Sequence, residues 1–186
     1  SDKHRFRVMK KNSIGLIELS SIAAGYLVAD AMLKAADTEL LLSRSICSGK
    51  YMTMVRGDVA AVMASVQAGV AAARGFIVDT FIIPNLHESI FPAIYGSNKV
   101  EDLEALGILE SFSVASLIEA ADAAAKSANV RLLEIRLAMA LGGKAFVTMT
   151  GAVAAVQAAV DAGAQVLGSK GLLVNKIVIA APRKEL

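Results

Sequence analysis

The sequence predicts an α/β (α+β) protein made of two tandem ferredoxin-like domains, each with the element order βαββαβ. The first observation is an internal repeat. Residues 15–44 match residues 107–136 at 12 of 30 positions with an offset of 92, and residues 50–69 match residues 144–163 at 10 of 20 positions with an offset of 94. The second observation is that each copy alternates apolar, strand-like runs with two Ala-rich helical segments.

Within each copy the elements follow from the local pattern. A short apolar run is followed by an Ala, Leu and Met-rich stretch that favours a helix, then by two strand-like runs joined by a Gly-bearing turn. A second helix with small residues and a final apolar strand complete the unit. The expected strands are 14–19, 38–46, 50–55 and 75–83 in the first copy, and 106–111, 130–139, 144–150 and 171–179 in the second.

Four segments follow from this pattern. Residues 1–12 form a basic N-terminal extension, 13–87 the first domain, 88–104 a linker and 105–186 the second domain. Pro84, Pro92 and Gly96 punctuate the segment between the two copies, and the linker is expected to hold one short helix.

Composition excludes several classes of function. With 19 basic and 17 acidic residues the net charge is only +2, and aromatic residues make up 5% of the chain, so no nucleic-acid partner is expected. The longest uncharged run, Ala145–Val160, is shorter than the roughly 20 apolar residues that cross a bilayer, so no membrane span is expected. No signal peptide is visible, and the single cysteine, Cys47, fits the reducing cytoplasm.

The polar residues do not suggest catalysis. Neither histidine has a partner in the sequence that would position it as a general base, so no catalytic residue is predicted. Asp30 precedes Lys34 by four residues, and Asp122 precedes Lys126 by four, which predicts surface ion pairs on helices rather than an active-site dyad. The chain is therefore not expected to be an enzyme.

Several motifs recur in order in both copies and resemble the bacterial microcompartment shell family. They are "DAMLKAAD" and "DAAAKSAN", turns ending "SGK" and "GGK", then "GDVAAV" and "GAVAAV", with a terminal "VIAAPR". The resemblance covers residues 13–183, and two copies in one chain point to the tandem-domain subclass. "ICSGK" and "PNLHESIFPAIYG" further resemble the iron–sulfur members of that subclass from propanediol-utilisation compartments.

This resemblance implies a cytoplasmic shell protein whose homotrimer forms a pseudohexameric tile with a central pore. Its expected partners are other shell proteins and encapsulated redox enzymes. The resemblance places an assembly edge at Lys34, Lys126 and Arg183. It also implies that two turns line the pore: Ile46, Cys47, Ser48, Gly49 and Lys50 in the first copy, and Leu141, Gly142, Gly143 and Lys144 in the second.

Cys47 is the candidate metal ligand. A threefold axis beside it would bring three thiolates together, which is enough to hold a 4Fe-4S cluster, one per trimer, by three of its irons. The alternative is that Cys47 binds no metal and is a small, moderately apolar residue lining the pore.

Two other functions stay open at this point. One is a tandem ferredoxin-like regulatory protein or enzyme that binds a small ligand in a cleft. The other is a soluble redox carrier, which would need more metal ligands per chain or the same oligomer.

Overall fold

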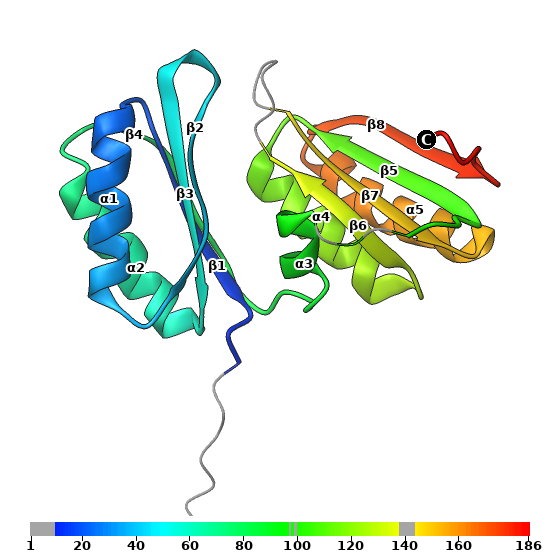
Figure 1. Cartoon of the computed structure of the whole chain (residues 1–186), viewed down its shortest axis with the longest axis horizontal. Helices are drawn as coiled ribbons and strands as arrows, with labels where there is room; N and C mark the ends of the chain where they lie inside the picture. Colours follow the sequence, from blue (N-terminus) through cyan, green and yellow to red (C-terminus); the bar gives the residue numbers. More distant parts are fainter. Residues whose placement is uncertain (1–9, 97, 99, 138–143) are drawn as a thin grey trace, which may run out of the picture. The chain divides into compact units, whose positions relative to one another are not determined.

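The computed structural model describes residues 10–96, 98, 100–137 and 144–186 of the chain. It divides into two compact units, Ser1–Arg44 with Met52–Asn85 and Ser45–Tyr51 with Leu86–Leu186, so the turn around Cys47 groups with the second unit although it belongs to the first copy of the repeat. Each copy is described by itself (Figure 1). None of the helices in these described ranges combines the length and the apolar character that a bilayer crossing requires.

The first unit has the predicted element order βαββαβ. Its four strands form one sheet in the order β2-β3-β1-β4, in which β1 and β4 are antiparallel. The elements are β1 (Ser13–Leu19), α1 (Ile22–Ala35), β2 (Glu39–Ile46), β3 (Lys50–Gly57), α2 (Val59–Ala72) and β4 (Ile77–Ile83).

The second unit repeats this topology, with the sheet order β6-β7-β5-β8. A short helix, α3 (Ile90–Tyr95), precedes it in the segment expected to be a linker. The other elements are β5 (Ala105–Ser111), α4 (Val114–Ser127), β6 (Arg131–Arg136), β7 (Ala145–Gly151), α5 (Val153–Ser169) and β8 (Leu173–Ala180). The predicted fold class is therefore confirmed, because both copies have the same strands, helices and sheet order.

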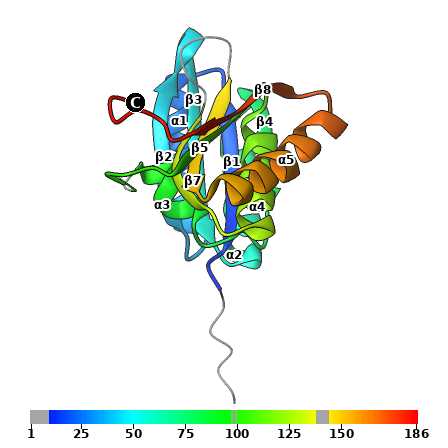
Figure 2. The same cartoon turned by 90° about the vertical axis from the view of Figure 1, so that its right-hand side faces the viewer.

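In each unit two helices cover one face of the sheet (Figures 1 and 2). Glycines allow this close packing, because an added Cβ at Gly15 would lie 2.7 Å from Val62 and Val66 of α2. Gly107 is in the same position in the second unit and faces Val156 and Val160 of α5. Since side chains alternate along a strand, these glycines identify which residues of β1 and β5 face the helices.

The N-terminus of the second helix differs between the copies. Asp58 caps α2, because its carboxylate accepts a hydrogen bond from the Ala61 N–H at 2.9 Å. The equivalent residue before α5 is Ala152, which makes no side-chain cap. One copy therefore satisfies a helix N–H group that the other leaves to water.

We expect Asp58→Ala to lower the free energy of unfolding by about 1 kcal/mol, because it removes this cap. The reverse change, Ala152→Asp, is expected to raise it by a similar amount, since the position is exposed and the backbone before α5 is already non-helical. Urea denaturation of both variants measures the effect. A loss of stability in both variants would contradict the cap assignment.

The two sheets also differ at one buried position on the helix side. Thr53 in β3 is fully buried, and its hydroxyl is the one buried side-chain polar atom without a hydrogen-bond partner among the described residues. Its counterpart in β7, 94 residues further on, is the fully buried Val147. A valine side chain, which has no polar atom, is therefore accommodated at the equivalent buried position of the second sheet.

Thr53→Val is expected to raise the free energy of unfolding by about 1 kcal/mol, because the unpaired hydroxyl is replaced by a methyl group of similar size. Val147→Thr is the matched control, and we expect it to destabilise the protein by about 1–3 kcal/mol. Thermal unfolding followed by calorimetry distinguishes the two. An unchanged or lower unfolding temperature for Thr53→Val would show that the hydroxyl is satisfied in solution.

Candidate functional site

The turn around Cys47 joins β2 to β3. β2 ends at Ile46, residues Cys47–Gly49 form one 3-10 turn, and Lys50 begins β3. Ser48 has a φ of 62° and Gly49 a φ of 71°, so both lie in the left-handed region. The left-handed backbone of Ser48 costs roughly 1–2 kcal/mol of conformational free energy. Other interactions of the turn must offset this cost.

The surroundings of Gly49 are open. A Cβ built at this glycine would meet no atom within 4 Å, so a bound group could approach the backbone here closely. Cys47, two residues earlier, is partly exposed. The turn therefore presents a thiol and an accessible stretch of backbone together.

These residues fit an iron–sulfur cluster only if several chains contribute. Within the described part of one chain, no group of three or more Cys, His, Asp and Glu side chains could hold a metal ion. Cys47 supplies one thiolate, and cuboidal clusters are held by three or four. The donor set is therefore incomplete in one chain and sufficient in three.

Of the four residues predicted to line the pore from the second turn, the structure describes one. Leu141, Gly142 and Gly143 lie outside the described residues, whereas Lys144 is described. The Lys144 Nζ lies 3.9 Å from Glu110 Oε1 and 5.7 Å from the centroid of the Phe112 ring. Two groups at the end of β5 thus attract the ammonium group of this lysine.

The spacing of the Asp and Lys residues on α1 and α4 correctly predicted their ion pairs. Lys34 Nζ lies 2.6 Å from Asp30 Oδ2, and Lys126 Nζ lies 2.7 Å from Asp122 Oδ2. Both lysines lie in the last turn of their helix, where the partial negative charge of the helix end also favours a cation. Both lysine side chains are exposed.

Asp122 has a second role that the sequence did not reveal. Its Oδ1 accepts a hydrogen bond at 2.7 Å from the His87 backbone N–H, which lies before α3. The His87 ring also contacts the Ser89 hydroxyl at 2.8 Å. Asp122 therefore ties the segment before α3 to α4, a contact across 35 residues that no local pattern marks.

Arg183, the third predicted edge residue, follows β8. Its Nη2 donates to Glu185 Oε1 at 2.9 Å, and this hydrogen bond raises the pKa of the Arg183 guanidinium and lowers the pKa of the Glu185 carboxyl.

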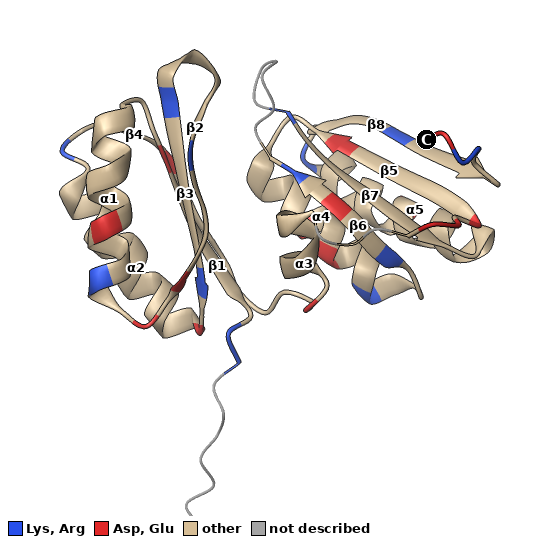
Figure 3. Ribbon diagram, in the orientation of Figure 1, with Lys and Arg blue, Asp and Glu red and all other residues tan. Residues whose placement is uncertain are grey.

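Elsewhere the described basic and acidic residues are interspersed (Figure 3), which agrees with the low net charge.

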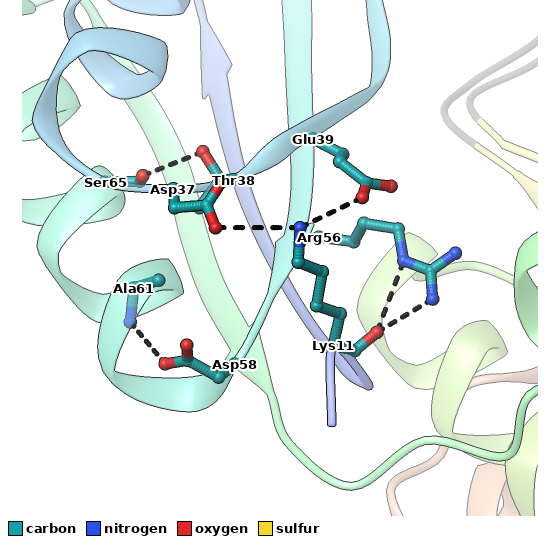
Figure 4. A network of polar contacts seen from close by, with 8 residues as sticks. All are labelled: Lys11, Asp37, Thr38, Glu39, Arg56, Asp58, Ala61 and Ser65. Carbon is teal, nitrogen blue, oxygen red and sulfur yellow. Dashed lines mark hydrogen bonds and ion pairs between the residues drawn. The ribbon is translucent and has the colours of Figure 1, made fainter. Parts of the chain in front are cut away.

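Lys11 belongs structurally to the first unit, although it lies in the predicted extension. Its ammonium is 3.2 Å from Glu39 and 3.7 Å from Asp37, and its carbonyl accepts a 2.9 Å hydrogen bond from Arg56 (Figure 4). The hydrogen bond with Glu39 is the main cause that raises the pKa of Lys11, and the charge of Asp37 adds to it. The end of the extension is therefore attached to β2 and β3.

Comparison with known proteins identifies the class. The family model described as the BMC domain matches residues 13–86 and 105–182. The chain therefore belongs to the BMC domain family and carries two tandem copies of that domain.

Individual relatives agree with this assignment. The chain is 43% identical to the bacterial microcompartment shell protein PduT of Citrobacter freundii over 174 residues, covering 94% of this chain and 95% of that protein. A crystal structure of a microcompartment protein from Desulfitobacterium hafniense superimposes with a TM-score of 0.90 at 50% identity, covering 93% and 96% of the two chains. The shell protein EutM of Escherichia coli matches over 85 residues at 41% identity, covering 43% of this chain and 88% of its own length.

Proposed function

We propose that the chain is a structural shell protein of a bacterial microcompartment and has no catalytic role. The observation that carries this proposal is the presence of two BMC domains over nearly the whole chain, together with the full-length similarity to a shell protein. No cluster of catalytic side chains was predicted from the sequence. The shell of such a compartment, in the cytoplasm, is the proposed location.

The proposed assembly is a homotrimer. Three chains with two domains each place six similar units around one axis, which makes a pseudohexagonal tile. The turns before β3 and β7 differ by two residues in length and differ in sequence, so the central pore has threefold symmetry. Such a tile would fill a shell facet beside other shell proteins.

The pore is the proposed functional centre. Residues 46–50 and 140–144 would line it, and Cys47 from three chains would hold one 4Fe-4S cluster per trimer, with a non-protein ligand on the fourth iron. Such a cluster would supply one-electron transfer across the shell, or would itself be transferred across it. Lys50 and the backbone N–H groups of the turn would stabilise negative charge near the axis, while Gly49 leaves room for close approach.

The outer edge of the tile is proposed to include Lys34, Lys126 and Arg183. The side chains of these three residues are exposed. The aliphatic part of a lysine side chain can pack along a neighbouring molecule while its ammonium group donates hydrogen bonds to backbone carbonyls. Other shell proteins are the proposed partners at this edge. Encapsulated redox enzymes are the proposed partners at the pore, where they would exchange electrons with the cluster.

Light scattering of the purified protein tests the assembly, and we expect the mass of three chains of 19.3 kDa. Electron microscopy of the same sample at high concentration is expected to show flat sheets with a hexagonal repeat. A monomer at all concentrations would contradict the tile, and would favour the ligand-binding alternative.

A further inference from the structure

The carboxylate of Asp122 in α4 binds two different parts of the second unit. Its Oδ2 lies 2.7 Å from Lys126 Nζ, one turn further along the same helix, and its Oδ1 accepts the His87 backbone N–H at 2.7 Å. A hydrogen bond from an N–H group to an ionised carboxylate is among the stronger ones in proteins. Because the backbone holds one oxygen, the carboxylate cannot turn freely, and its second oxygen stays directed towards Lys126.

The His87 N–H is itself held in place. The Ser89 N–H donates to His87 Nδ1 at 3.2 Å, and the Ser89 hydroxyl lies 2.8 Å from the same nitrogen. These contacts close the turn that leads into α3, and α3 packs against β6 and α4. All of these contacts lie within one compact unit of the chain. The anchor of Asp122 is therefore a backbone group that a packed helix keeps in position.

The first copy has the same ion pair without this anchor. Lys34 Nζ lies 2.6 Å from Asp30 Oδ2 in α1, at the same spacing of four residues. Among the residues that the structure describes, Lys34 is the one hydrogen-bond partner of the Asp30 side chain. An exposed pair of this kind, with no further support, orders its side chains only weakly. The two copies therefore present the corresponding lysine with different degrees of order.

This difference matters for association, because fixing a long side chain at an interface costs conformational entropy. A lysine that is already held near its bound position loses less freedom when a neighbour docks. An ammonium group has three N–H donors, so it can keep its ion pair with a carboxylate and still donate to a backbone carbonyl of the neighbour. Docking then does not require the ion pair to break.

We propose that Asp122 is a positioning residue for Lys126 at the tile edge: anchored by the His87 N–H, it holds the ammonium group in place before a neighbouring tile docks. This inference rests on the proposed tile edge and names the residue that orders it. Because Asp30 lacks the anchor, the edge contact of the second copy is stronger than that of the first. A trimer then has edge contacts of two strengths in alternation.

The test measures the protein concentration at which flat sheets appear, by sedimentation and electron microscopy, for variants that light scattering shows to be trimers. Asp122→Asn keeps an oxygen that can accept the His87 N–H but loses the charge that holds Lys126. We expect this variant to need about tenfold more protein to form sheets, with nearly unchanged unfolding in urea. Asp30→Asn is the matched control, and we expect its sheet-forming concentration to rise by less than about threefold.

A double substitution shows whether Asp122 acts through Lys126. Lys126→Ala alone is expected to raise the sheet-forming concentration at least as much as Asp122→Asn does. Adding Asp122→Asn to Lys126→Ala is expected to have no further effect. Asp122→Ala also removes the contact with His87, so we expect it to lower the urea midpoint as well, which separates the structural role of this carboxylate from its positioning role.

The outcomes separate this inference from the proposed edge. Normal sheets from both Lys34→Ala and Lys126→Ala would show that neither lysine lies at an edge and would overturn both. Impaired sheets from the lysine variants with normal sheets from Asp122→Asn would overturn the positioning role alone. An equal effect of Asp122→Asn and Asp30→Asn would do the same, and so would an undiminished effect of Asp122→Asn in the Lys126→Ala background.

Discussion

Cys47→Ser is expected to lose nearly all of the iron that the wild-type protein binds on anaerobic reconstitution with iron and sulfide. The wild-type protein should bind about four irons per trimer and show the brown absorbance of a cluster. Serine keeps the size of the side chain but presents no thiolate at neutral pH, so each of the three cluster ligands is removed together. Iron and sulfide analysis of protein purified by gel filtration measures the difference.

Ser48→Gly is the matched control for this experiment. It leaves Cys47 unchanged and relieves the left-handed backbone of Ser48, so we expect iron binding to persist. Equal iron in wild type and Cys47→Ser would defeat the proposed cluster, and so would about one cluster per chain. Equal iron in the two proteins would leave Cys47 as an ordinary small residue of the proposed pore.

The second large effect is expected at the tile edge. Lys126→Asp and Lys34→Asp should abolish extended sheets while trimers persist, because a carboxylate would face the backbone carbonyls that the ammonium group is proposed to contact. Each change also places two carboxylates four residues apart, with Asp122 or Asp30, which costs only a few tenths of a kcal/mol in the helix. Electron microscopy reports the sheets, and light scattering reports the trimers.

Lys170→Asp is the control for non-specific charge effects. Lys170 follows α5 and forms an exposed ion pair with Glu119 at 2.6 Å, so like the edge lysines it is an exposed, ion-paired lysine at the end of a helix. We expect this variant to form sheets. Sheets of normal size from both Lys34→Asp and Lys126→Asp would show that these lysines are ordinary surface residues.

Most of the fold could be predicted because it depends on local patterns that occur twice. The repeat, the strand and helix order, and the Asp–Lys pairs all follow from spacing within one element or from one offset between the copies. The contact of His87 with Asp122 and that of Lys11 with Arg56 could not be predicted, since each joins residues more than 30 positions apart.

The candidate site was harder to predict for a physical reason. The proposed ligand set is built by symmetry, so the sequence would show only one of its members, and Cys47 is the single cysteine of the chain. The resemblance to a family, rather than any spacing, identified the turn. The second turn could not be compared in full, because Leu141, Gly142 and Gly143 lie outside the described residues.

The unequal turns before β3 and β7 have a consequence for stoichiometry. A ring of six separate, identical domains would place any cysteine of the turn at six equivalent points, too many thiolates for one cuboidal cluster. In the proposed trimer, covalent fusion of two domains lets one turn keep the cysteine while the other lacks it, so the number of donors at the proposed axis would be halved. Divergence of the two copies at a single hairpin would thus turn a sixfold opening into the proposed threefold coordination site.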